Sequence, residues 1–254
     1  KSAIIKVGDW EKKTNDQLNN LYDGPMKPFS NYDVYIEAKG ISGETATATA
    51  SFKTGRLDTP WVAKWITDMS YNFPDKTSPK PMAFRRRFEL NKKVRQAFFN
   101  STALGIYDLY LNGEKVGEDY FSPGFTSYNH QIQYQTYDVT ELLHKNNEVL
   151  AIVAGGWAVG SYTIRRKSKI SADRQALLCE LHIEYDDGTF DIIKTDENWE
   201  VTLNSNYIMA EWYDGETYDA TVDLHKSGWK KADITRQRGN PQLIAQYGPP
   251  VRTM

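Results

Sequence analysis

The fold is decided by residues 106–157, which open with IYDLYLNG at 106–113 and close with GGW at 155–157. The Asn112-Gly113 pair lies between two β-rich runs, and both residues of such a tight turn must accept positive φ. The pair therefore predicts a β-hairpin. Residues 148–154 are apolar at odd and even positions, which predicts a central strand that is buried on both faces. The remainder of the chain reads as further sheet arranged around these strands.

Composition excludes several classes of protein. The 254 residues permit one large β domain or two smaller ones. A net charge of −2, from 31 basic and 33 acidic residues, predicts neither a nucleic-acid nor a membrane partner. Cys179 is the single cysteine, so no internal disulfide is possible. The longest nearly apolar run, 149–159, is much shorter than the roughly 20 residues of a membrane-spanning helix.

Residues 1–57 form a first predicted unit. Strands are expected at 2–7, 32–38 and 48–52, with turns between them. The pattern is similar to the later strands of a fibronectin type III sandwich, which has about seven strands in total. We therefore expect a partial fibronectin type III-like β-sandwich that is truncated at its N-terminus.

Residues 58–240 form the predicted main domain. Alternating runs continue to its end, and a second hairpin is expected over 177–195 around Asp186-Asp187-Gly188. No long amphipathic helix is evident. The chain is therefore expected to be all-β, with a jelly-roll, galactose-binding-like β-sandwich as its main domain. Residues 241–254 are read as a linker, with a last strand near 243–246.

One strand end is a candidate site for carbohydrate. Trp157 follows two glycines, and with Tyr162, Arg165 and the neighbouring Arg166 it could present a ring face to the C–H groups of a sugar. Alternatively, Trp157 packs over the end of the sandwich. Glutamines at 131, 133 and 135 share one strand face, which could hydrogen-bond hydroxyl groups or simply be solvated.

A catalytic role for the cluster of acidic residues is less well supported than a carbohydrate site at Trp157. Glu211, Asp214, Glu216 and Asp219 could include a glycosidase pair, which needs carboxylates about 5–9.5 Å apart. Spacing within a turn does not set that distance, and Asp-Gly is a turn signal by itself. We therefore expect a structural role, in capping turns or in docking, and no catalytic residue. The four histidines are too scattered for a metal site or a catalytic triad.

Residues 61 to about 235 resemble the N-terminal β-sandwich domain of bacterial α-L-rhamnosidases. The resemblance rests on six motifs taken in this order: WVAKWI at 61–66, LGIYDLYLNGEKVG at 104–117, SPGFTSY at 122–128, YQTYDVTELL at 134–143, GGW at 155–157 and YDGETYDA at 213–220. The hairpin and the YDVTELL run alone are also similar to the sugar-binding sandwich of β-galactosidases and β-glucuronidases.

The resemblance implies a role within a larger enzyme. Such rhamnosidases are inverting glycosidases whose catalytic carboxylates lie in an (α/α)6 barrel that follows these sandwiches. The chain is then a non-catalytic accessory region, its partner is the catalytic (α/α)6 domain of the same polypeptide, and residues 241–254 lead towards that domain. The alternatives are an autonomous carbohydrate-binding module for rhamnose-containing glycans, and the accessory sandwich of another glycosidase such as a β-galactosidase relative. The family also implies a secreted or periplasmic protein.

The resemblance raises the question of calcium. In some family members this sandwich binds rhamnose through calcium, and an acidic or amide residue just before the Gly-Trp pair helps to hold the ion. Here Ala154 and Gly155 precede Gly156-Trp157, and neither has a side-chain oxygen. Because calcium takes six to eight oxygen ligands, we expect no metal and no other cofactor.

Overall fold

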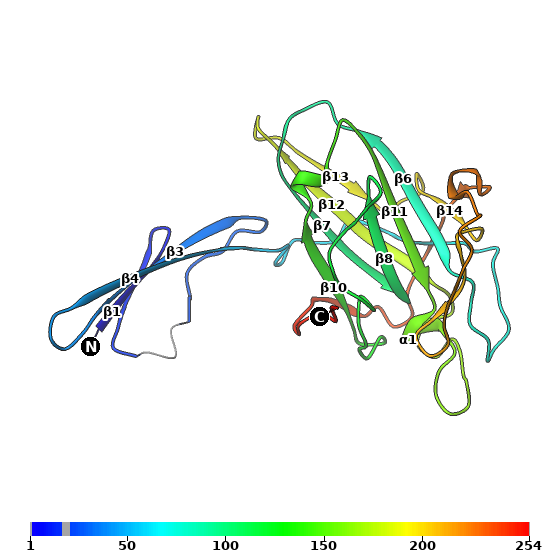
Figure 1. Ribbon diagram of the computed structural model, residues 1–254, viewed down its shortest axis with the longest axis horizontal. Coiled ribbons are helices and arrows are strands. Elements are labelled where there is room, and N and C mark those ends of the chain that lie inside the picture. The colour runs from blue at the N-terminus through cyan, green and yellow to red at the C-terminus, as the bar shows by residue number, and fades with distance from the viewer. Residues whose placement is uncertain (1, 17–20, 254) are drawn as a thin grey trace. The chain divides into compact units, whose positions relative to one another are not determined.

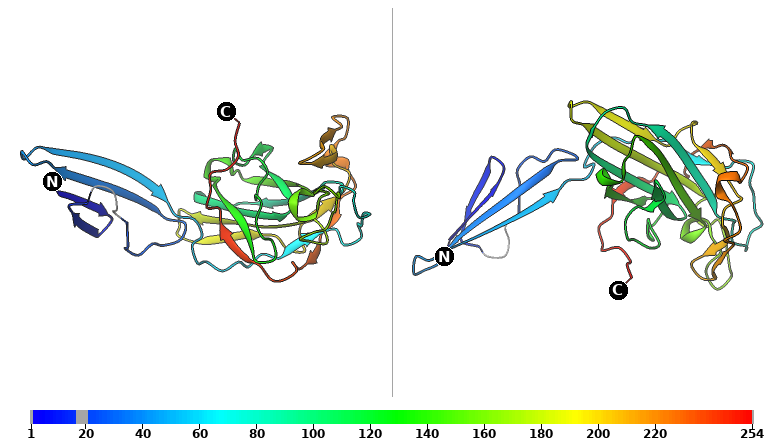
Figure 2. Two further views of the ribbon diagram at one scale, coloured as in Figure 1. Left: turned by 90° about the horizontal axis from the view of Figure 1, so that it is seen from below. Right: turned by 45° about the horizontal axis from the view of Figure 1, so that its top comes forward.

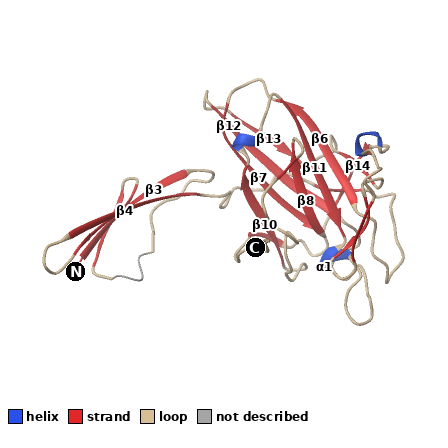
Figure 3. Cartoon of the chain, viewed as in Figure 1, coloured by secondary structure: helices blue, strands red, loops and turns tan. Residues whose placement is uncertain are grey.

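The computed structural model describes residues 2–16 and 21–253, which form two compact units, Lys1–Pro60 and Trp61–Met254. The chain is nearly all β, as expected (Figure 3). Within these described residues, three short helical segments interrupt the strands: η1 (Thr140–Leu142), α1 (Gly156–Val159) and η2 (Leu224–Lys226). No helix of the described residues is long and apolar enough to cross a membrane.

The first unit contains one antiparallel sheet of four strands in the order β2-β1-β3-β4 (Figure 1). The strands are β1 (Ser2–Val7), β2 (Trp10–Thr14), β3 (Asn31–Lys39) and β4 (Thr45–Lys53). Register aligns Ile5 with Ile36 and Ile36 with Ala48, so apolar side chains share one face. The predicted strands are present. The described residues form a single layer, and the fibronectin type III-like sandwich stays a prediction.

The second unit is a sandwich of two sheets (Figures 1 and 2). One sheet has the order β18-β5-β12-β7-β10-β19, with β13 paired to β12. Its strands are β5 (Trp65–Thr67), β7 (Val94–Leu104), β10 (Gln131–Asp138), β12 (Ala176–Tyr185), β13 (Phe190–Lys194), β18 (Asp233–Thr235) and β19 (Gln242–Ala245).

The other sheet has the order β17-β14-β6-β11-β8-β9, and a separate hairpin pairs β15 with β16. These strands are β6 (Met82–Glu89), β8 (Ile106–Leu111), β9 (Glu114–Lys115), β11 (Asn146–Ala154), β14 (Glu200–Thr202), β15 (Tyr207–Glu211), β16 (Gly215–Tyr218) and β17 (Lys230–Lys231).

The core lies between the two sheets and follows from alternation along the strands. Phe84, Leu109 and Val153 of one sheet belong to the same buried cluster as Phe99 and Leu177 of the other. Burying such side chains contributes roughly 1.5–3 kcal/mol each, which makes this the main source of stability. The core fixes the strand ends, and the ends of β8 and β11 carry the candidate site.

The opening hairpin has the predicted geometry. Asn112 and Gly113 join β8 to β9 with φ of 55° and 85°. The Asn112 amide nitrogen also donates to the Leu142 carbonyl at 2.7 Å, and its oxygen accepts the Glu148 backbone N–H at 2.9 Å. The predicted central strand is β11, which lies between β6 and β8. The side chain of Asn112 therefore ties the turn to the central strand.

The C-terminal segment belongs to the sandwich sheet. β19 pairs in parallel with β10, aligning Leu243 with Ile132 and Ala245 with Tyr134. Further along, Val251 forms a bridge with Tyr120. The last strand expected near 243–246 is present, and the segment beyond it lies against the loop that precedes β10.

Candidate functional site

The site is built on a sharp turn between β11 and α1. A side chain at Gly156 is disfavoured because φ there is 51° and a Cβ would lie 2.7 Å from Ile106 Cγ2. A Cβ at Gly155 would lie 2.7 Å from the Gly160 Cα atom. The two glycines therefore let the chain reverse against β8. The helix α1, which includes Trp157, lies at the end of the sandwich (Figure 1).

Trp157 lies at the centre of an aromatic patch formed by Phe121, Phe125, Trp157, Trp212 and Tyr213. Its ring centroid is 5.2 Å from that of Trp212, 6.1 Å from Phe125 and 6.2 Å from Phe121. Trp212 in turn lies 3.9 Å from Tyr213. Phe121, Phe125 and Tyr213 are 44%, 60% and 56% exposed. Such a cluster presents apolar ring faces to solvent, where the C–H face of a sugar can stack.

A hollow of about 210 Å³ adjoins this patch. It is lined by Trp157, the loop at 120–125, the C-terminal segment 246–251, and the amide side chains of Gln133 and Gln135. The Gln135 oxygen accepts the Tyr107 hydroxyl at 2.8 Å, and its nitrogen donates to the Pro123 carbonyl at 3.2 Å. The Gln135 amide is thus held within the protein, and the hollow combines ring faces with the Gln133 amide, a combination typical of sites for small polar ligands.

The predicted residues are only partly brought together. Tyr162 is half-buried in the loop at 161–170, where its N–H donates to the Lys167 carbonyl at 3.0 Å. The ring contacts found for Trp157 within residues 2–16 and 21–253 are to Phe121, Phe125 and Trp212 and do not include Tyr162. Arg165 is exposed, while Arg166 forms an ion pair with Asp214. A ligand contact by Tyr162 or Arg165 stays a prediction.

The structure adds residues that the sequence motifs did not single out. Phe121 and Phe125 from the 120–125 loop and Trp212 from the end of β15 join Trp157, and this meeting depends on the tertiary fold. Two of the three glutamines on the β10 face line the hollow. The sequence indicated that these glutamines share one face of a strand. It did not indicate that this face lies beside Trp157.

The acidic residues around Asp214-Gly215 serve local structure. Asp214 pairs with Arg166, and Asp219 Oδ1 accepts the Thr221 N–H at 2.9 Å and its hydroxyl at 2.6 Å. These contacts lower the pKa of both carboxyls. Glu211 differs because it is buried, and that burial raises its pKa from 4.5 to about 7. A structural rather than catalytic role for the cluster stays a prediction.

The residues at the Gly-Trp turn do not fit calcium. Ala154 and Gly155 supply no side-chain oxygen, and Glu211 is the carboxylate that packs against Gly155 and Gly160. Across the part of the chain that the structure describes, no group of three or more His, Cys, Asp or Glu side chains could hold a metal ion. A site for calcium would need six to eight oxygens.

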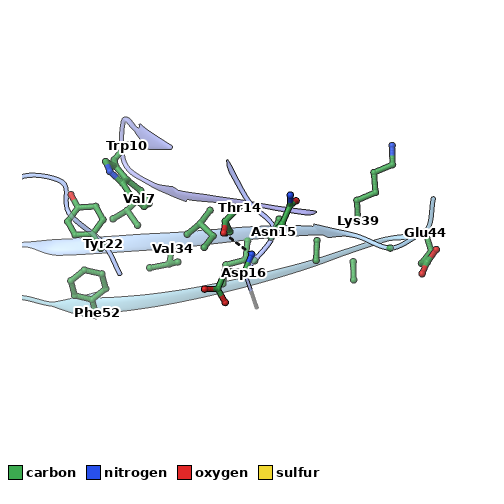
Figure 4. A pocket seen from close by; sticks show the side chains of 16 residues that line it. Val7, Trp10, Thr14, Asn15, Asp16, Tyr22, Val34, Lys39, Glu44 and Phe52 are labelled. Atoms are coloured by element: carbon green, nitrogen blue, oxygen red, sulfur yellow. Dashed lines mark hydrogen bonds between the residues drawn. The ribbon is translucent and has the colours of Figure 1, made fainter. Parts of the chain in front are cut away.

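A larger hollow, of about 730 Å³, lies over the apolar face of the first unit's sheet. Figure 4 shows side chains that line it, among them Val7, Trp10, Val34 and Phe52. Strict alternation puts these residues on one face, which is typical of a sheet face that packs against a second layer. We interpret it as a packing face and place the candidate site at Trp157.

Comparison with known proteins identifies the family. The profile of the α-L-rhamnosidase N-terminal domain matches residues 92–254. The α-L-rhamnosidase of Streptomyces avermitilis is 37% identical over 180 residues, which are 66% of this chain and 17% of that protein. That of Formosa agariphila is 33% identical over 181 residues, 68% of this chain and 20% of the relative. The chain thus spans about a fifth of the length of these relatives.

Solved structures agree with the fold. The α-L-rhamnosidase of Aspergillus terreus superposes with a TM-score of 0.85 at 25% identity, over 99% of this chain and 31% of the other. The α-L-rhamnosidase of Dictyoglumus thermophilum superposes with a TM-score of 0.85 at 23% identity, over 99% of this chain and 32% of the other. The matched profile covers more than half of the chain, and it includes the hairpin, the Gly-Trp turn and the YDGETYDA motif. The chain therefore belongs to the α-L-rhamnosidase N-terminal domain family.

Proposed function

We propose that this chain is a non-catalytic accessory region of an α-L-rhamnosidase that binds rhamnose-containing glycans at the aromatic patch, without a metal. The observation that carries the proposal is the Trp157 aromatic patch beside the hollow that the Gln133 amide lines. Ring faces recognise the apolar face of a sugar, and amides can exchange hydrogen bonds with its hydroxyl groups. The relatives are α-L-rhamnosidases, which makes L-rhamnose the sugar to test.

The accessory role is supported by the size of the relatives and by the state of the carboxylates. The chain spans about a fifth of the curated rhamnosidases, which leaves room for a catalytic domain, the proposed (α/α)6 barrel, in the same polypeptide. Asp214 and Asp219 are engaged in local contacts, and Glu211 is buried. The chain alone should therefore release no p-nitrophenol from p-nitrophenyl α-L-rhamnoside, and measurable release would contradict this part of the proposal.

Calorimetric titration tests the binding part. L-rhamnose should give saturable heat with the intact chain, in EDTA and in calcium alike. The Trp157→Ala variant should lose at least about fivefold in affinity, since a ring contact contributes on the order of 1 kcal/mol. Phe190→Ala is the matched control because Phe190 is an exposed aromatic on β13, outside the patch. Absence of heat at millimolar sugar, or binding that requires calcium, would refute the proposal.

The same titration decides between this proposal and the alternative of an autonomous binding module. An autonomous module binds its glycan tightly as an isolated domain. An accessory site can bind weakly by itself, because its attachment to the enzyme raises the effective concentration of the glycan. Micromolar binding by the isolated chain would favour the autonomous module.

A further inference from the structure

Glu211 is a buried carboxyl at the base of the aromatic patch. It ends β15, directly before Trp212, and is 3% exposed. Its Oε1 accepts the backbone N–H of Trp212 at 2.9 Å. Its Oε2 is buried and has no hydrogen-bond partner within residues 2–16 and 21–253. A bare carboxylate oxygen in such a place is costly, which favours the neutral, protonated acid.

The carboxyl occupies space that two glycines leave open. A Cβ at Gly160 would lie 1.9 Å from Glu211 Oε2, and a Cβ at Gly155 would lie 2.9 Å from it. Gly155 and Gly160 flank α1, and Trp157 lies between them. Glu211 therefore connects the segment that carries Trp157 to the segment that carries Trp212, and the two ring centroids lie 5.2 Å apart.

In the part of the chain that the structure describes, the Ser78 hydroxyl and the Trp212 indole nitrogen at this end also lack a hydrogen-bond partner. The Ser78 hydroxyl lies near the carboxyl without a hydrogen bond of good geometry, and the Trp212 indole nitrogen is buried without an acceptor. The charged groups that face Glu211 are Asp214, in the β15–β16 turn, and Arg166, from the loop at 161–170. These two side chains pair with each other. Arg166 attracts a negative charge on Glu211, and it forms its ion pair with Asp214.

Burial is the main reason that the pKa of Glu211 rises to about 7, and the charge of Asp214 raises it further. The hydrogen bond from the Trp212 N–H opposes the rise, as do the nearby Ser161 N–H and Ser78 hydroxyl, because all three favour the charged form. The carboxyl therefore changes charge near neutral pH, in direct contact with the glycines that flank α1.

We propose that Glu211 is a positioning residue that couples the arrangement of Trp157 and Trp212 to the protonation of one buried carboxyl oxygen. The neutral acid holds α1 against β15 and keeps the two rings together. The charged form draws water or a donor towards Oε2 and loosens the pair. The coupling between Glu211 and the two rings does not depend on sugar binding. Its effect on sugar affinity rests on the proposed function.

Near-ultraviolet circular dichroism of the intact chain from pH 5 to 8.5 tests the coupling. The wild type should show one transition near pH 7. Glu211→Gln, which keeps the shape and stays neutral, should retain the low-pH spectrum throughout, and Glu211→Ala should lose the signal of the ring pair. Glu216→Gln is the matched control, because Glu216 is an exposed carboxylate in the same hairpin, and it should titrate like the wild type.

Two variants, Trp157→Phe and Trp212→Phe, assign the transition to this pair of rings. Each variant should remove the transition. Persistence of the transition in Glu211→Gln, or in both Trp variants, would overturn the inference, as would a featureless wild type. Titration with L-rhamnose at pH 6 and 8 separates the two proposals. Sugar binding without a spectral transition rejects the coupling alone, and a transition without sugar binding at either pH rejects the proposed function alone.

Discussion

Glu211 also makes a quantitative prediction about stability. Its pKa is about 7 in the folded chain against an ordinary value of 4.5. At about 1.4 kcal/mol per pH unit, the difference corresponds to about 3 kcal/mol. The folded state holds a proton that the unfolded chain releases, so the stabilisation is complete below pH 4.5 and is lost as pH rises through 7.

The assay is urea unfolding of the wild type and of Glu211→Gln between pH 4.5 and 8. Six of the seven tryptophans lie in Trp61–Met254, so intrinsic fluorescence reports the unit that contains Glu211. Relative to the Gln variant, the wild type should lose about 3 kcal/mol of unfolding free energy over this range. Parallel curves for the two proteins, or a wild type that gains stability with rising pH, would refute the reasoning.

Further predictions concern the core and the turns. Trp199 is fully buried between the sheets, and Trp199→Ala should lower the unfolding free energy by about 3–5 kcal/mol in the same assay. Gly156→Ala should destabilise the protein more than Gly188→Ala. Both glycines have positive φ, but a Cβ at Gly156 clashes with Ile106 whereas a Cβ at Gly188 meets open space. Equal melting temperatures of the two variants would contradict this prediction. Asn112→Ala should cost about 1–3 kcal/mol through its lost hydrogen bonds, and an unchanged melting temperature would count against it.

The sheet elements were predictable because their signals are local. Asn112-Gly113 demands positive φ at both positions, and the apolar run of β11 marks a strand between two neighbours. The parallel pairing of β19 with β10 was not predictable, because the aligned residues Leu243 and Ile132 are more than a hundred positions apart. Alternation within a strand gives no information about such a partner.

The site was predictable only in part for the same reason. The glycines before Trp157 mark a strand end, yet the rings that surround it come from the 120–125 loop and from Trp212. Glu211 looked like one member of an acidic turn cluster. Its burial follows from packing against Gly155 and Gly160, which lie about fifty residues earlier in the chain.

The central claim, that the aromatic patch binds rhamnose, is tested most directly by the seven indole N–H resonances of the chain. During titration with L-rhamnose, the Trp157 signal should shift saturably, and the adjoining Trp212 signal should follow it. Trp199, which is buried and donates to the Lys194 carbonyl at 2.8 Å, and Trp10 of the first unit should stay in place. Immobility of the Trp157 signal at saturating sugar, or a shift confined to Trp10, would contradict the account.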